Sequence, residues 1–153
     1  MKVLLYSEMM DKIGKSGLGH AIYHQQKALD LVGVDYTIDP NDDFDLLHIN
    51  TYFPKSYLLA RECKKKGIPV IYHAHSTMED FCKSFKGSDL VAPLFKEWLK
   101  WCYSLGDVII TPTDYSKSIL KSYGLDQPIY AVSNGINLKS FKEIPNAREV
   151  LQR

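Results

Sequence analysis

Two short segments of the sequence hold residues whose types and spacing could do chemistry. The first, SGLGH at residues 16–20, directly precedes a helical pattern, and backbone amides at a helix start bind anions. Gly17, Leu18 and Gly19 are the candidates for such binding. The second, HAHST at residues 73–77, ends an apolar run with two histidines and a serine. Imidazoles in this position can hold a metal, move a proton or simply pack.

The glycine segment does not match the common nucleotide-binding loops. A P-loop ending in GKS would need a glycine at position 9, which is Met9. A dinucleotide fingerprint needs G-x-G-x-x-G at the strand end, whereas Gly14, Gly17 and Gly19 are spaced differently. Asp39 does stand where a ribose-binding acid would end the second strand, so an NAD-type Rossmann enzyme stays an alternative. A tight turn with close packing of helix on sheet is equally open for the glycines.

HAHST resembles half of a metal site, but the rest of that pattern is missing. A metallo-hydrolase motif H-x-H-x-D-H needs Asp at 77 and His at 78, where the chain has Thr77 and Met78. We therefore expect no metal at this segment. A hydrogen-bonded packing role stays open for each histidine.

The elements that must position these segments follow from the alternation of apolar runs with helical patterns. Strands this apolar on consecutive positions are buried on both faces, which predicts an α/β fold with a Rossmann-like, doubly wound parallel sheet. Ligands of such sheets bind beyond the carboxyl ends of the strands, where both segments are expected. We expect strands at 2–7, 34–39, 45–50, 68–74, 107–112 and 128–134, and helices near 18–32, 55–66, 91–105 and 114–123.

Length and composition limit the remaining possibilities. A chain of 153 residues is expected to form one core. The net charge of +1 argues against a dedicated nucleic-acid binder. Three cysteines without a C-x-x-C pair and the lack of a signal-peptide pattern predict a cytoplasmic protein. No apolar run reaches the roughly 20 residues needed to cross a bilayer, so any membrane contact is expected to be peripheral.

The segment LVAPLFKEWLKWCYSL at residues 90–105 is the most amphipathic part of the chain. Trp98 and Trp101 beside Lys96 and Lys100 suit a helix at the surface of an anionic membrane. A single apolar stripe of this width also suits packing against the sheet, and both interpretations stay open.

Taken together, the motifs resemble those of family-four glycosyltransferases with the two-Rossmann-domain (GT-B) architecture. Two departures are visible: Asn137 stands where the family usually has Asp, and no Glu has a second Glu eight positions later, a signature of the family's C-terminal, donor-side domain. The matching segments are SGLGHAIYHQQKALDLVGVDYTI, DLLHIN, GIPVIYHAHST, DVIITPTDYSKSILKSYG and PIYAVSNGIN. Within the family they look most like enzymes that extend monoglucosyl-diacylglycerol.

The resemblance implies an acceptor-binding domain at 1–140 and, at 141–153, the start of a linker or of a truncated C-terminal domain that would complete the enzyme. The whole enzyme would be a hexosyltransferase that moves a hexose, with retention, from UDP-glucose or UDP-galactose to a glycolipid acceptor. It would need no metal or other cofactor and would sit peripherally on the inner face of the cell membrane. The isolated domain is expected to be inactive.

The resemblance also implies roles for single residues. His75 would be the active-site histidine, and the amides of Gly17, Leu18 and Gly19 would face the donor diphosphate. The secondary candidates are His20, His73 and Ser76. A non-catalytic module that binds a glycolipid or a membrane remains the alternative from another class.

Overall fold

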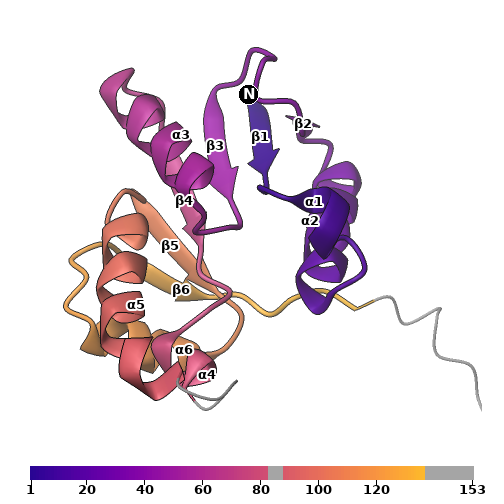
Figure 1. The fold of residues 1–153 in the computed structure, drawn as a ribbon. Coiled ribbons are helices and arrows are strands. Elements are labelled where there is room, and N and C mark those ends of the chain that lie inside the picture. The colour runs from indigo at the N-terminus through magenta and orange to yellow at the C-terminus, as the bar shows by residue number, and fades with distance from the viewer. Residues whose placement is uncertain (83–87, 137–153) are drawn as a thin grey trace, which may run out of the picture.

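The computed structural model describes residues 1–82 and 88–136, and this part forms a six-stranded parallel sheet in the order β2-β1-β3-β4-β5-β6 (Figure 1). The predicted doubly wound parallel sheet is thereby confirmed. The expected boundary at residue 140 lies outside the described residues. The strands are β1 (Lys2–Tyr6), β2 (Asp35–Thr37), β3 (Leu46–Ile49), β4 (Val70–His73), β5 (Val108–Thr111) and β6 (Ile129–Ala131), and the helices are α1 (Met10–Ile13), α2 (Gly17–Val32), α3 (Pro54–Lys65), α4 (Met78–Phe81), α5 (Ser88–Tyr103) and α6 (Asp114–Ser122).

The two faces of the sheet are covered unequally. The chain moves from β1 to β2 in one direction and from β3 through β6 in the other, and right-handed crossovers therefore place α2 opposite α3, α5 and α6. Figure 1 shows α2 standing apart from these three helices. One face thus packs against three helices, and α2 lies against the other.

The apolar core lies between the sheet and the three-helix side. Alternate residues of the central strands, among them Leu47, Ile49, Val70 and Tyr72, are fully buried there. They pack against Ala60 and Cys63 of α3, Leu99, Cys102 and Tyr103 of α5, and Leu120 of α6. The residues between them on each strand belong to the face that α2 covers.

The predicted elements agree with the structure except at their ends and in two short helices. Gly33 ends α2 with φ at 67°, a left-handed conformation that suits a glycine at a helix C-terminus. β2 has three residues rather than six because it pairs with only Lys2, Val3 and Leu4 of β1. α1 and α4, of four residues each, were not predicted, because a single turn shows no periodicity.

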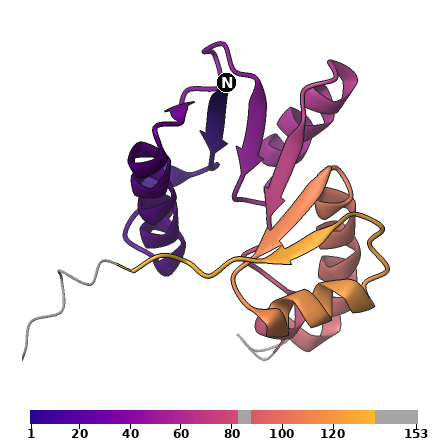
Figure 2. The same cartoon turned by 180° about the vertical axis from the view of Figure 1, so that it is seen from behind.

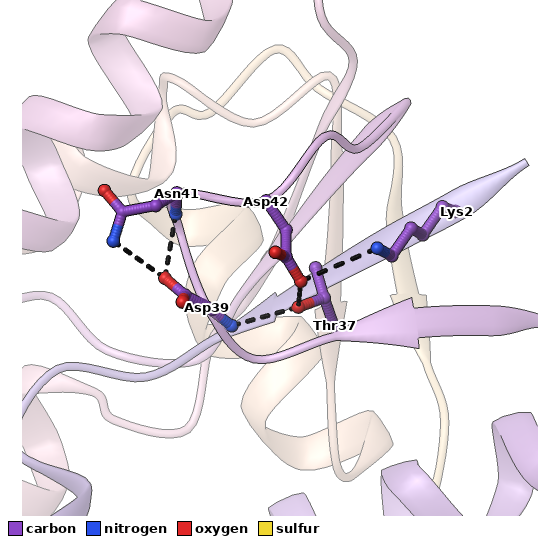
Figure 3. A network of polar contacts seen from close by, with 5 residues as sticks. All are labelled: Lys2, Thr37, Asp39, Asn41 and Asp42. Carbon is purple, nitrogen blue, oxygen red and sulfur yellow. Dashed lines mark hydrogen bonds and ion pairs between the residues drawn. The ribbon is translucent and has the colours of Figure 1, made fainter.

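A polar network fixes the connection from β2 to β3 (Figure 3). Asp39 accepts hydrogen bonds from the backbone and side-chain nitrogens of Asn41, at 2.9 and 2.8 Å. Asp42 accepts one from the Thr37 hydroxyl and faces Lys2 at 3.6 Å, and both contacts lower its pKa. Asp39, the ribose-binding candidate of the dinucleotide alternative, is therefore bonded within its own loop.

The described chain ends beside α2. Figure 2 shows the segment after β6 crossing toward this helix. A Cβ built on Gly135 would lie 3.6 Å from Cβ of His24. The last described residues therefore run along the side of the molecule that holds α2.

The two glycines at the start of α2 differ in what surrounds them. A Cβ added to Gly19 would lie 2.3 Å from the carbonyl oxygen of Gly14 and 2.6 Å from its Cα. A Cβ on Gly17 would meet nothing within 4 Å. Gly19 is thus needed for the close approach of the preceding loop, whereas Gly17 has no such packing role.

We expect Gly19→Ala to destabilise the chain by about 1–3 kcal/mol, because a backbone segment must move to admit the methyl group. Urea unfolding followed by circular dichroism measures this change. Gly17→Ala is the matched control and should be neutral or slightly stabilising, since alanine is the better helix former by about 1 kcal/mol. Equal effects of the two substitutions would contradict the packing role of Gly19.

Candidate functional site

Polar side chains from two neighbouring strands gather on the face that α2 covers. Side chains two positions apart on a strand point the same way, so His48 and Asn50 share a face, as do His73 and His75. The register of β3 with β4 aligns His48 with Ile71, two positions before His73. Both polar pairs therefore lie on the same side of the sheet, at its carboxyl edge.

The four side chains and Gln25 of α2 form a connected group, here called the histidine cluster. The imidazole rings of His73 and His75 are stacked, with centroids 4.1 Å apart, and those of His48 and His73 are 5.4 Å apart. Nε2 of His48 lies 3.2 Å from Nδ1 of His73. Nε2 of Gln25 lies 3.0 Å from the same Nδ1 and 2.9 Å from Oδ1 of Asn50. Nε2 of His75 lies 2.9 Å from that oxygen.

Burial makes the three imidazoles of the histidine cluster hard to protonate. Loss of hydration lowers the pKa of His75 to about 4, and loss of hydration together with the nearby His75 lowers that of His48 to about 4. The pKa of His73 falls to about 2, because this ring is buried and faces both other histidines. All three rings are therefore neutral near pH 7 and act there as hydrogen-bonding groups, not as cations.

Hydroxyl groups hold the backbone on both sides of His75. The Thr111 hydroxyl donates to the carbonyl of Ala74 at 3.1 Å, and the hydroxyl of buried Tyr103 donates to the carbonyl of Ser76 at 2.8 Å. Within residues 1–82 and 88–136, the carbonyl of His75 between them accepts no hydrogen bond. The loop therefore fixes His75 while leaving its carbonyl available to a ligand.

A pocket of about 200 Å³ opens beside His75, between the loops that follow β4 and β5. The hydroxyls of Thr77 and Thr113 cap α4 and α6, and the ring of Tyr115 at the pocket is 69% exposed. The volume suits a ligand the size of one small ring rather than a larger molecule. The lining residues are Ala74, His75, Thr77, Asp80, Pro112, Thr113, Tyr115, Ser116 and Ile119.

The glycine segment and the histidine cluster make no hydrogen bond to each other in the described chain. The Gly19 amide donates to the side chain of Ser16 at 3.3 Å, which caps α2. The amides of Gly17 and Leu18 donate to no group among the described residues. His20 is exposed and lies outside the histidine cluster. Two amides at the start of α2 are thus open to an anion.

Helix α5 carries an inner and an outer apolar stripe. Trp98 belongs to the inner stripe, and its indole N–H donates to the Tyr52 carbonyl at 2.8 Å. The outer stripe consists of Leu90, Leu94 and Trp101, which are 85%, 74% and 62% exposed and, at spacings of four and seven, share one face.

The two lysines of α5 both have partners. Lys96 lies 4.6 Å above the ring of Tyr123. Lys100 pairs with Glu97 at 3.5 Å. Of the four residues predicted to touch a membrane, Trp101 is the one on the exposed outer stripe.

Two kinds of feature are absent from the part of the chain that the structure describes. It contains no group of three or more His, Cys, Asp or Glu side chains arranged to hold a metal ion. None of its helices is both long enough and apolar enough to cross a bilayer.

Sequence reasoning found His73 and His75 but missed their partners. Gln25 and Asn50 were not predicted, although the H-x-N spacing at the end of β3 and the H-x-H spacing at the end of β4 were a usable signal. Both spacings place two polar side chains on one face of a buried sheet, where each must find a partner. The pocket residues Thr77 and Tyr115 gave no comparable signal.

Comparison with known proteins adds two findings. A sequence profile described as Glycosyltransferase Family 4 matches residues 29–140. The chain is also 44% identical over 143 residues to a processive diacylglycerol alpha-glucosyltransferase of Acholeplasma laidlawii. The aligned region is 93% of this chain and 42% of the relative, so the chain spans less than half of that protein's length.

The neutral histidine cluster predicts a loss of stability in mild acid. In the unfolded chain the rings regain an ordinary pKa of about 6.5 and bind protons below that pH, whereas in the folded chain they bind protons only at about pH 4 or below. The free energy of unfolding should therefore fall as the pH drops from about 7 toward 4.5, by up to about 1.4 kcal/mol per pH unit for each histidine.

Urea unfolding measured across that pH range tests this prediction. His48→Gln should reduce the pH dependence by roughly one histidine's share. His20→Gln, which changes an exposed ring of α2, should leave it as in the wild-type chain. An unchanged pH dependence in His48→Gln would show that His48 is not kept neutral by the fold.

Proposed function

The chain belongs to glycosyltransferase family 4, and we propose that it is the N-terminal, acceptor-side domain of an enzyme that adds a hexose to a glycolipid of the glucosyl-diacylglycerol type. The observation that carries this proposal is the 44% identity to a diacylglycerol glucosyltransferase, because it extends over 93% of the chain and includes the histidine cluster and the pocket. The relative's greater length fits a second domain that follows this one.

The donor in this proposal is UDP-glucose or UDP-galactose, transferred with retention and without a metal ion. The open amides of Gly17 and Leu18 support a role in binding the leaving diphosphate, since the start of α2 also carries partial positive charge. Gly19 contributes through close packing, as its own amide is bonded to Ser16. Basic groups of the second domain would supply the remaining charge.

His75 is the proposed active-site residue, and the neighbouring pocket is the proposed place of a sugar ring. The carbonyl of His75 is held between two bonded carbonyls and can face positive charge that develops on the sugar in the transition state. The exposed ring of Tyr115 offers an apolar surface to the C–H face of a sugar. His73 supports His75 by stacking on its ring. Ser76 supports it through the backbone, because the Ser76 carbonyl accepts a hydrogen bond from Tyr103.

In the full-length enzyme we expect His75→Ala to lower kcat by about a hundredfold or more, because the imidazole that lines the proposed sugar pocket is lost. A sugar-transfer assay with a panel of UDP-sugars and glycolipids measures this change. Leu31→Ala, at an 87% exposed position near the far end of α2, is the control and should retain most of the activity. Wild-type turnover in His75→Ala would remove this side chain from the site, and turnover by the 153-residue chain alone would contradict the need for a second domain.

The outer stripe of α5 supports peripheral attachment to the cytoplasmic face of the membrane. Leu90 and Leu94 are large exposed apolar side chains, and Trp101 adds an amphipathic ring of the kind found at lipid head groups. α5 begins after α4, near the carboxyl edge of the sheet that holds His75 (Figure 1). A membrane bound there would bring a lipid-anchored acceptor close to the proposed site.

We expect the chain to float with anionic vesicles at low salt, and Leu94→Glu to weaken this binding at least severalfold, since a charge would enter the apolar contact. Flotation of equal protein amounts over a range of lipid concentrations measures the effect. Leu31→Glu is the matched control, because Leu31 is 87% exposed but lies on α2, on the opposite face of the sheet. Absence of vesicle binding by the wild-type chain, or equal losses in both variants, would contradict the role of the outer stripe.

A further inference from the structure

The amide group of Gln25 determines which atoms in the histidine cluster carry protons. Its nitrogen, Nε2, has two hydrogens and lies 2.9 Å from Oδ1 of Asn50 and 3.0 Å from Nδ1 of His73. Each hydrogen thus has one acceptor. An imidazole nitrogen that accepts a hydrogen bond holds no proton, so neutral His73 carries its proton on Nε2. Nε2 of His48 lies 3.2 Å from the same Nδ1, whose one lone pair already accepts from Gln25, so this contact does not determine where His48 carries its proton.

The direction of these hydrogen bonds, that is, which atom donates and which accepts, also determines the direction of the bond between Asn50 and His75; this order is here called the polarity of the cluster. Oδ1 of Asn50 has two lone pairs and accepts from Gln25 with one of them. The second faces Nε2 of His75 at 2.9 Å, and an oxygen can only accept from a nitrogen that carries a hydrogen. Neutral His75 therefore has its proton on Nε2. Its other ring nitrogen, Nδ1, has no hydrogen-bond partner among the described residues, and His75 lines the pocket.

We infer that Gln25, acting through Asn50, holds His75 in the Nε2–H tautomer, so that Nδ1 presents a lone pair and accepts a hydrogen bond from a hydroxyl group of the ligand. Gln25 and Asn50 are positioning residues in this inference, because neither touches the ligand. The hydroxyl as ligand group rests on the proposed function, in which a sugar occupies the pocket. The tautomer itself rests on the geometry of the five side chains alone.

This polarity limits the chemistry open to His75. Its single proton is bonded to Asn50, so the side chain cannot donate a proton from Nδ1 to a leaving group. The ring can orient a hydroxyl, or accept its proton, but it does not begin as an acid. A ligand that offers only acceptors to Nδ1 would be disfavoured, because two lone pairs would face each other.

Gln25→Glu reverses the polarity and therefore tests it. A carboxylate only accepts, so His73 must donate from Nδ1 and Asn50 must turn its NH2 group toward the carboxylate. That NH2 group then also faces His75, whose Nε2 becomes an acceptor and whose proton moves to Nδ1. Gln26→Glu is the matched control, because it adds the same charge to the next position of α2, outside the histidine cluster.

The measurement is long-range proton–nitrogen correlation NMR of the 15N-histidine-labelled chain at about pH 8, which reads directly which ring nitrogen is protonated. We expect His75 to be protonated on Nε2 in the wild type and in Gln26→Glu, and on Nδ1 in Gln25→Glu. A wild-type His75 protonated on Nδ1 would overturn the inference. So would Gln25→Glu in which Nε2 keeps its proton, whether or not Nδ1 also gains one.

A second variant keeps the test decisive if a buried carboxylate unfolds the chain. Gln25→Met keeps the approximate size and removes both donors, so Asn50 is free in either orientation and His75 should show a mixture of tautomers. A single unchanged Nε2–H tautomer in Gln25→Met would contradict the role of Gln25. No substrate enters these measurements, so a full-length enzyme without sugar transfer would refute the proposed function and leave the tautomer result standing.

Discussion

The two hydrogen bonds that Gln25 donates, to Asn50 and to His73, join α2 to the carboxyl edge of the sheet, and the arrangement of the site depends on them. Polar groups buried at this edge must be paired, since an unpaired buried donor or acceptor costs roughly 1–3 kcal/mol. Pairing does not extend to every atom: Nε2 of His73, Nδ2 of Asn50 and Oε1 of Gln25 have no partner among the described residues. Such unsatisfied groups are uncommon in folded proteins and call for a partner, such as a ligand group or an ordered water.

The same strand alternation produces both the core and the site. On β3 and β4, Leu47, Ile49 and Tyr72 face the three helices α3, α5 and α6, and the intervening His48 and His73 face α2. The side with three helices provides the apolar burial that stabilises the sheet. The other side, with one helix, can therefore hold polar groups close to an open edge without loss of the core.

This division explains which features could be read from the sequence. Apolar runs and the position of His75 after a strand are local patterns, and such patterns predicted the fold and the sheet edge that carries the candidate site. The partnership of Gln25 with Asn50 joins residues 25 positions apart and depends on how α2 crosses the sheet. The outer stripe of α5 could not be separated from the inner one in the sequence for another reason. Inner and outer apolar residues alternate so closely along 90–105 that the pattern indicates a single stripe.

The neutral state of the histidine cluster also limits how the proposed site could bind a nucleotide diphosphate. Three imidazoles with pKa values of about 4 or below carry no charge near pH 7 and cannot offset the anion. The open amides at the start of α2 offer partial positive charge without a proton that could be lost. In the proposed enzyme, charge and hydrogen-bond direction would thus come from different elements of the domain: α2 would provide an electropositive end for the leaving group, and the histidine cluster an oriented lone pair for the sugar. A neutral His75 is compatible with a positively charged transition state, which a protonated histidine in the same place would oppose.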